Sequence, residues 1–169
     1  MGTNAAIETL VAKQEIREVL SRYCRGLDRM DKAMAYSVWH EDGTADYEGI
    51  FKGKGHAFVE WVWEAHARMS CHSHQVTNVL VELDGEFATS EAYVTVMLWL
   101  AGEAMDRQTE IVVRGRYLDR WSKRAGRWAI DHRTHLVDAQ SIRQVTRGKS
   151  TPSAARDESD PSFGFIPKA

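Results

Sequence analysis

The chain has 169 residues, of which 43% are hydrophobic and 27% are charged. This length suits one domain, and the composition is that of a globular protein, which excludes disorder over the whole chain. The formal net charge of −2 gives no general attraction to nucleic acid or to a membrane surface. Since long apolar runs and a signal-peptide pattern are also lacking, we expect a cytoplasmic protein that does not enter a membrane.

The first part of the chain has the apolar spacing of helices. Trp39 lies on the apolar face of the second predicted helix, which Gly43 ends. Residues 44–47 have the pattern of a short strand, and the glycines between residues 49 and 55 indicate a turn region. The three helices are predicted over residues 5–29, 31–40 and 56–69.

Long segments rich in β-branched residues follow, separated by hairpin signals such as Asp84-Gly85. Three helices followed by antiparallel strands predict an α+β fold, in which a cone-shaped curved sheet packs three N-terminal helices on one side. The interior of such a cone is a natural pocket for a small hydrophobic molecule. The four strands are predicted over residues 72–83, 87–100, 109–123 and 127–137.

The end of the chain changes in character. All three prolines lie after residue 147, and residues 148–160 are rich in Ser, Asp and Pro. We therefore expect one domain over residues 1–147 and a flexible tail over residues 148–169. The tail contains the apolar segment Phe163 to Pro167, which either docks on the body or on a neighbouring subunit or is a frayed terminus.

Asp28 and His74 are the first candidates for chemistry. Asp28 ends the first predicted helix beside core-facing positions, so it is either a partly buried carboxylate that needs a partner or a solvent-facing cap. His72 and His74 share one face of the first long strand. An Asp–His pair would suit general-base catalysis, because the carboxylate orients the imidazole and stabilises its protonated form.

A metal site is the alternative for the histidines. It needs a third and usually a fourth ligand. His132 and His135 lie three residues apart on a predicted strand, so only one of them could join His72 and His74. The two cysteines have no zinc spacing, and the sequence contains no dinucleotide, Walker A or nucleophile-elbow motif. We expect no metal and no organic cofactor.

Further polar candidates lie on the predicted strands. Arg114 and Arg116 share a strand face, which is either solvated or, if it faces inward, suited to binding an oxyanion or a carboxylate. Tyr47, Tyr93 and Tyr117 are candidate phenolic donors for the same task. The six tryptophans and five tyrosines either line the pocket or fill the core.

Four motifs stand out together in the chain: IREVLSRYCRGLD at 16–28, SVWHEDGTADYEGIFKG at 37–53, HQVTN at 74–78 and GRYLDRWSKRAGRW at 115–128. In this order and spacing they resemble the SnoaL-like branch of the nuclear-transport-factor-2-like superfamily, an α+β roll that is also called cystatin-like. The resemblance spans about residues 5–138, nearly the whole body. It is greatest to the cofactor-free lyases: hexachlorocyclohexane dehydrochlorinase, scytalone dehydratase and the bile-acid dehydratases.

The resemblance implies a catalytic pair of Asp28 and His74 inside the cone, with His74 as the base. The dehydrochlorinase has Lys or Gln where this chain has Tyr23, which argues against haloalkane chemistry. A phenol at position 23 suits the polarisation of a hydroxyl or a carbonyl, as in the dehydratases. The residues expected to bind the substrate are Trp39, Tyr47, Tyr93, Arg116, Tyr117 and His135.

The function implied is that of a cofactor-independent lyase in aromatic compound catabolism. It would act on a small apolar substrate, aromatic or polycyclic, by dehydration or by C–C cleavage such as deformylation. Related cones are isomerases and cyclases, and others are non-catalytic, such as the small β subunit of ring-hydroxylating dioxygenases. Isomerisation, cyclisation and an assembly role therefore stay open. The resemblance also implies a homo-oligomer, either a dimer or a trimer.

Overall fold

A computed structural model describes residues 2–101, 106–146, 148 and 153–166. No helix in these ranges is both long enough and apolar enough to cross a bilayer. In chain order the elements are α1 (Thr3–Asp28), α2 (Lys32–Ser37), β1 (Trp39–Tyr47), β2 (Phe51–Lys54), α3 (Gly55–Ala67), β3 (Cys71–Asp84), β4 (Phe87–Ala101), β5 (Arg107–Arg124), β6 (Arg127–Thr146) and the 3-10 helix η1 (Pro161–Gly164).

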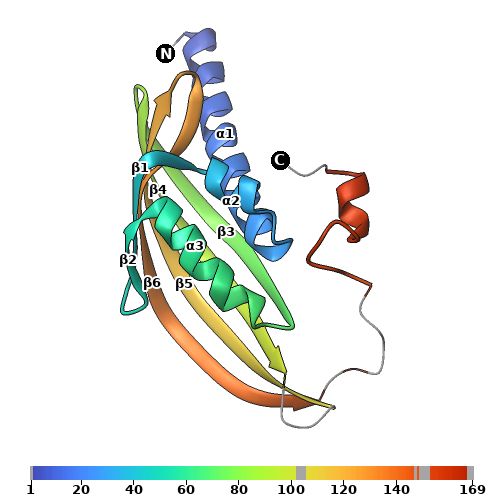
Figure 1. Ribbon diagram of the computed structural model, residues 1–169. Coiled ribbons are helices and arrows are strands. Elements are labelled where there is room, and N and C mark those ends of the chain that lie inside the picture. Colours follow the sequence, from blue (N-terminus) through green and yellow to red (C-terminus); the bar gives the residue numbers. More distant parts are fainter. Residues whose placement is uncertain (1, 102–105, 147, 149–152, 167–169) are drawn as a thin grey trace.

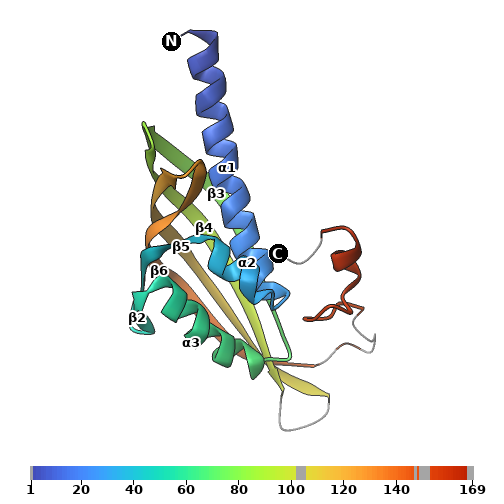
Figure 2. The same cartoon turned by 45° about the horizontal axis from the view of Figure 1, so that its top comes forward.

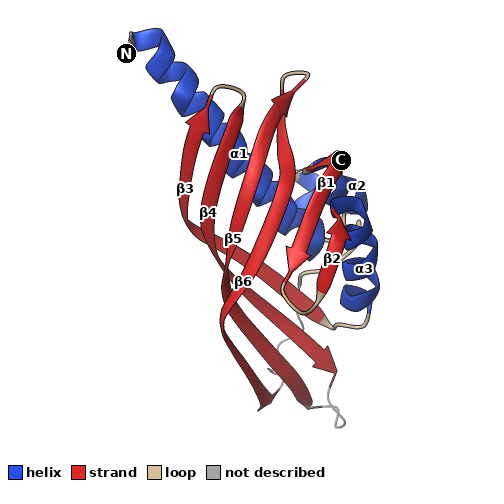
Figure 3. Ribbon diagram, turned by 90° about the vertical axis from the view of Figure 1, so that its left-hand side faces the viewer, coloured by secondary structure: helices blue, strands red, loops and turns tan. Residues whose placement is uncertain are grey.

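The strands form one curved sheet in the order β2-β1-β6-β5-β4-β3. β1 runs parallel to β6, and the other neighbouring strands pair antiparallel. The three helices lie on one face of this sheet, which leaves the opposite face uncovered by helices (Figures 1 and 3). The structure therefore confirms the α+β fold with a curved, unclosed sheet.

Bulges in the long strands account for the curvature. The β3–β4 register shifts between Thr77 and Leu80, and the β5–β6 register shifts between Arg114 and Gly115. Each extra residue bends its strand and increases the local twist. At Gly115 an added Cβ would lie 2.1 Å from the carbonyl oxygen of Leu136, so no other residue fits this bend without a shift of the backbone. The bent strands form the concave face.

α1 covers the concave face with only its C-terminal half. Ile16, Leu20 and Leu27 recur at helical spacing and are almost fully buried. Leu10, in the N-terminal half, is 68% exposed, and this half extends past the sheet (Figure 2). The buried half ends at Asp28, which brings this carboxylate to the interior of the fold.

The start of the sheet differs from the prediction. The second helix ends at Ser37, and Trp39 begins β1 instead of lying on the helix. The turn predicted around Lys52 is wrong, because Phe51–Lys54 pairs with β1 as strand β2. Gly55 starts α3, where an added Cβ would lie 2.4 Å from the Trp39 ring. Pairing with distant strands outweighs local glycine and helix signals here.

The last strand is longer than predicted. β6 continues to Thr146 rather than ending near Val137, and it pairs with β5 over its whole length up to Arg107 opposite Thr146. The residues after Val137 are mostly exposed and lack a clear alternation of polar and apolar side chains. Pairing with β5, rather than burial, therefore maintains this part of the strand.

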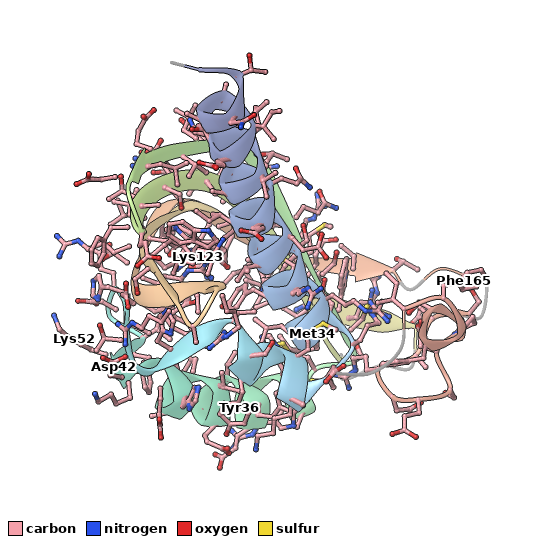
Figure 4. The ribbon with its side chains drawn as sticks, turned by 90° about the horizontal axis from the view of Figure 1, so that it is seen from above. Met34, Tyr36, Asp42, Lys52, Lys123 and Phe165 are labelled. Atoms are coloured by element: carbon pink, nitrogen blue, oxygen red, sulfur yellow. The ribbon has the colours of Figure 1, made fainter. Side chains whose placement is uncertain are left out.

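The described part of the tail lies against the end of α1. Arg29 pairs with Asp160 at 3.0 Å, and Arg25 donates hydrogen bonds to Ser162 Oγ and to the carbonyl oxygen of Ile166. Asp160 in turn caps η1. Phe165 is 87% exposed and points outward from this segment (Figure 4). A contact of this apolar end with a neighbouring subunit stays a prediction.

Candidate active site

Asp28 and His74 form a hydrogen-bonded pair. Asp28 is the last residue of α1, and His74 lies near the start of β3. The distance from Asp28 Oδ1 to His74 Nδ1 is 2.6 Å, and Asp28 Oδ2 accepts the backbone N–H of His74 at 2.9 Å. The side chains are 12% and 5% exposed, respectively. Both carboxylate oxygens of Asp28 are thus hydrogen-bonded to His74.

This geometry determines which nitrogen of His74 is available. An ionised carboxylate only accepts hydrogen bonds, so the proton between the pair belongs to Nδ1 of the imidazole. The other nitrogen, Nε2, then carries the lone pair. His74 can therefore accept a proton through Nε2 while Asp28 stabilises the imidazolium that results.

Two tyrosines lie beside this pair. The hydroxyl groups of Tyr23 and Tyr47 are 2.6 Å apart, and the Tyr23 ring meets the His74 ring edge-on at 6.4 Å. Burial is the main cause that raises the pKa of Tyr23 and of Tyr47 well above the usual 10.0. Both phenols are therefore protonated donors. One proton is used between them, which leaves one hydroxyl proton for a ligand.

Two further histidines pack behind His74. The His66 ring lies 4.1 Å from the His72 ring and 5.7 Å from the His74 ring. His72 Nε2 donates to the carbonyl oxygen of Leu27 at 2.7 Å, which ties β3 to the turn of α1 that carries Asp28. Burial is the first cause that lowers the pKa of His66 to about 2 and that of His72 to about 4. Both rings are therefore neutral near pH 7.

Arg133 is a fully buried cation in the same region. Its Nε and Nη2 donate to the two oxygens of Asp119 at 2.7 and 2.8 Å, and both side chains are 0% exposed. The guanidinium lies over the rings of Tyr117 and Tyr23, at 3.9 and 4.3 Å from their centroids. Burial opposes its charge, but the Asp119 carboxylate outweighs this and raises the pKa of Arg133 above the usual 12.5.

His135 is a further buried polar side chain in this region. Its ring contacts the rings of Tyr47 and Tyr117 at 5.2 and 5.3 Å, and the residue is 5% exposed. Within the described ranges, neither ring nitrogen has a hydrogen-bond partner. Burial, followed by the charge of Arg133, lowers the pKa of His135 to about 4. The ring is therefore a neutral imidazole near pH 7.

A cavity of about 420 Å³ lies between α3 and the concave face of the sheet. Small-molecule sites have volumes from about 300 Å³ upward and are mostly apolar with a few polar groups. Apolar side chains from α3, such as Phe58 and Trp61, face others from β4, β5 and β6. The polar wall consists of Tyr23, Tyr47, His66, His74, Tyr117 and His135.

Comparison with known families identifies the domain family of this chain. The SnoaL-like domain family matches residues 8–134. The chain belongs to the SnoaL-like family. The match confirms the SnoaL-like resemblance of the sequence motifs. A comparison with curated proteins gave no match.

Solved structures share the fold of this SnoaL-like protein. Rv3472 from Mycobacterium tuberculosis, a protein of unknown function, is 27% identical, with a TM-score of 0.69 over 82% of this chain and 78% of that chain. The hexachlorocyclohexane dehydrochlorinase LinA-type3 from Novosphingobium barchaimii LL02 is 17% identical, with a TM-score of 0.72 over 87% and 99%. A candidate scytalone dehydratase from Novosphingobium aromaticivorans is 18% identical, with a TM-score of 0.68 over 85% and 97%.

The structure brings together most of the predicted site residues. Asp28, His74, Tyr23, Tyr47, Tyr117 and His135 converge on the cavity or directly beside it. Among the residues that the structure describes, no group of three His, Cys, Asp or Glu side chains could hold a metal ion. The convergence joins elements from both ends of the chain, which no single motif indicates.

Three predicted substrate-binding residues do not line this cavity. Trp39 is 1% exposed and packs in the core, because it belongs to β1 and fills the space above Gly55. Tyr93 is 45% exposed on the strand face that points away from the helices. Arg116 lies opposite Tyr93 and pairs with Asp138 at 3.1 Å. These three positions are corrected by the structure.

Sequence reasoning missed Arg133 and His66. An arginine within a strand is normally solvent-facing, so its residue type does not indicate a buried position. A signal was present, since Arg133 and His135 are two residues apart and therefore share a strand face. His66 lies on the third predicted helix among apolar residues and had no partner close in sequence.

Proposed function

We propose that this protein is a cofactor-independent lyase with His74 as its general base. The observation that carries the proposal is the Asp28–His74 hydrogen bond on the wall of a largely apolar cavity. The substrate would be a small apolar molecule, aromatic or polycyclic. Solved structures with a similar fold, which include a dehydrochlorinase and a candidate dehydratase, support the same reaction class.

Elimination of water follows from the groups in place. His74 Nε2 takes a proton from the carbon next to the one that bears the hydroxyl group. The electrons of that C–H bond form the new double bond, and the C–O bond breaks. The Tyr23–Tyr47 pair donates its available proton to the departing oxygen, which leaves as water. The proton on His74 then returns to the tyrosine pair, so the protein is regenerated.

The same first step serves other reactions. If the substrate has no leaving group, return of the proton to a different carbon gives an isomerase. C–C cleavage and cyclisation also begin with a base in the cavity. We favour dehydration because both phenols stay protonated and lie next to the base. The open cavity and the bonded pair favour an enzyme over an assembly subunit.

The proposal is tested with purified protein in D2O and a panel of uncharged hydroxylated aromatic and polycyclic ketones. We expect the wild type to exchange a carbon-bound proton for deuterium and to release water from at least one compound, as read by NMR and mass spectrometry. The variant His74→Ala should reduce turnover by about 10²–10⁴-fold, the usual contribution of a general base.

The variant His56→Ala is the matched control. His56 is also a histidine, but its ring packs on Tyr36 and does not line the cavity. It should keep the wild-type rate. Unchanged turnover in His74→Ala would refute the mechanism. Tight binding of the panel with neither exchange nor conversion would instead favour a binding or assembly role.

A further inference from the structure

His135 is a polar group on the cavity wall without a polar partner. It is 5% exposed, and in the described part of the chain neither Nδ1 nor Nε2 makes a hydrogen bond. Its nearest ring neighbours, Tyr47 and Tyr117, contact it through their rings. Buried polar atoms are nearly always hydrogen-bonded, so two such atoms on one side chain indicate a partner that enters the site.

His135 differs from the other polar groups of this wall. The hydroxyl groups of Tyr23 and Tyr47 bond to each other, and His74 bonds to Asp28. In the described part of the chain His66 has one buried ring nitrogen without a partner, Nδ1, whereas both ring nitrogens of His135 lack one. The His135 ring contacts Tyr47, and the His74 ring contacts Tyr23, the hydrogen-bond partner of Tyr47. Since His74 and His135 both line the cavity, a ligand bound against the tyrosine pair would lie near both histidines.

The charges around the cavity bear on what it can bind. Among the described residues that line it there is no lysine or arginine, and the exposed Glu48 lines it. Arg133 is near, but its side chain is 0% exposed and two of its nitrogens bind Asp119. An anionic ligand would leave water without a matching charge and would meet a carboxylate at Glu48. These charges favour an uncharged ligand.

The protonation state of His135 also favours an uncharged ligand. Its pKa is lowered to about 4 by burial and by the charge of Arg133, so the ring is neutral at pH 7. A neutral imidazole has one N–H donor and one acceptor nitrogen. The N–H can donate to an oxygen that gains negative charge during a reaction without the ring itself being charged beforehand.

Resting on the proposed function, we propose that His135 is a substrate-binding residue that donates a hydrogen bond to an oxygen on an sp² carbon of an uncharged ring compound. Such an oxygen is that of a ketone or a phenol. Bound to a carbonyl oxygen, His135 would acidify the neighbouring C–H bond that His74 attacks. The two histidines would then act on the same substrate within one cavity.

The test uses binding and does not need turnover. The probes are 2-naphthol, 2-methylnaphthalene and 2-naphthoate, which share a ring system and differ in the oxygen group. Affinities are measured by calorimetry for the wild type and for His135→Phe, which keeps a ring but removes both nitrogens, and for His135→Asn, which keeps an N–H donor. The ¹⁵N shifts of the labelled His135 ring are recorded with each probe.

We expect the wild type to bind 2-naphthol more tightly than 2-methylnaphthalene and to bind 2-naphthoate most weakly. His135→Phe should lose about three- to tenfold in 2-naphthol affinity, the range for one net hydrogen bond, and little in 2-methylnaphthalene affinity. His135→Asn should recover part of the loss. In the wild type, only 2-naphthol should shift the ring nitrogens strongly.

Several outcomes would overturn the proposal. They are an unchanged preference for 2-naphthol in His135→Phe, unaltered ring-nitrogen shifts when 2-naphthol is bound, tighter binding of 2-naphthoate, or no binding of 2-naphthol by the wild type. The proposed function fails separately. If the His135 results hold but His74→Ala keeps the wild-type turnover, the cavity binds ketones or phenols and the base has been assigned wrongly.

Discussion

At the scale of single residues, the buried neutral histidines make stability depend on pH. Burial lowers the pKa of His66 to about 2 and the pKa values of His72 and His135 to about 4. In the unfolded chain these groups titrate near pH 6.5. Below that pH the unfolded state therefore binds protons that the folded state does not, and the free energy of unfolding falls as the pH falls.

We expect this loss to begin near pH 6.5 and to continue toward about pH 4. Each histidine contributes at most about 1.4 kcal/mol per pH unit to the slope. Urea denaturation at about pH 7, 6 and 5 measures the free energy of unfolding at each pH. In the variant His66→Leu this free energy should fall less per pH unit than in the wild type. Equal stability across this range would contradict the neutral state of the three rings.

The sequence predicted Asp28, His74 and several of their neighbours, but not the buried ion pair beside them. Asp28 and His74 were found because each has a residue type and a position that suit catalysis, and because their motifs resemble a known family. The buried ion pair of Arg133 and Asp119 was missed, since strand charges are usually solvated and the partners lie on neighbouring strands.

At the scale of the elements, the contact between α1 and α2 keeps Asp28 in place. A Cβ added at Gly26 would lie 2.8 Å from the backbone nitrogen of Ala35 in α2. Gly to Ala within a helix normally stabilises a protein by about 0.5–1 kcal/mol. Here the clash is with backbone, which a rotamer change cannot relieve, and overpacking of this kind costs about 1–3 kcal/mol.

We therefore expect Gly26→Ala to destabilise the protein by about 1–2 kcal/mol, in spite of its better helix propensity. Chemical denaturation measures this, and NMR of His74 reports whether the Asp28 hydrogen bond persists. Gly148→Ala is the control, because an added Cβ there meets nothing within 4 Å. A more stable Gly26→Ala variant would mean that the two helices separate easily.

The elements differed in how well they could be predicted. α1, α3 and the strands β3 to β5 have strong local periodicity, and each was expected close to its observed position. Of β1 only the end, residues 44–47, was expected as a strand, and β2 was not expected. β1 is held by parallel pairing with β6, which lies far along the chain. The extension of β6 beyond Val137 has the same cause, since its pairing with β5 rather than its own pattern maintains it.

At the scale of the whole molecule, the tail links the ends of two helices. Arg29 of the α1–α2 turn pairs with Asp160, and Arg156 donates to the carbonyl oxygen of His66 at 2.7 Å near the end of α3. Hydrogen bonds from Ser162 and Ala155 lower the pKa of Asp160 below the usual 3.8. The carboxylate therefore keeps its negative charge, and its ion pair with Arg29, at pH values below 3.8.

Removal of the chain from residue 153 onward should loosen these helix ends. We expect a Tm lower by about 2–5 °C, since the contacts are few and partly exposed. Amides in the last turn of α1 should exchange faster with solvent, as measured by hydrogen–deuterium exchange. The double variant Arg29→Gln and Arg156→Gln should reproduce part of the effect. An unchanged exchange rate would show that the helix ends do not depend on the tail.

Self-association stays a prediction at this scale. Apolar side chains on the strands, such as Leu80 and Ile142, are 69% and 64% exposed. The expected dimer or trimer rests on the family resemblance.

The cavity takes its reactive groups and its shape from different elements. Asp28, Tyr23, Tyr47 and His74 come from α1, β1 and β3, whereas α3 supplies apolar lining such as Phe58 and Trp61. An engineer could therefore vary Trp61, Val62 and Ala65 of α3 to accept new ring systems. Phe58, which stacks on Tyr47, and His66, which packs on His74, would be kept so that the proton-transfer groups retain their positions. Evolution by the same route would let this fold change its substrate specificity while its proton-transfer groups stay the same.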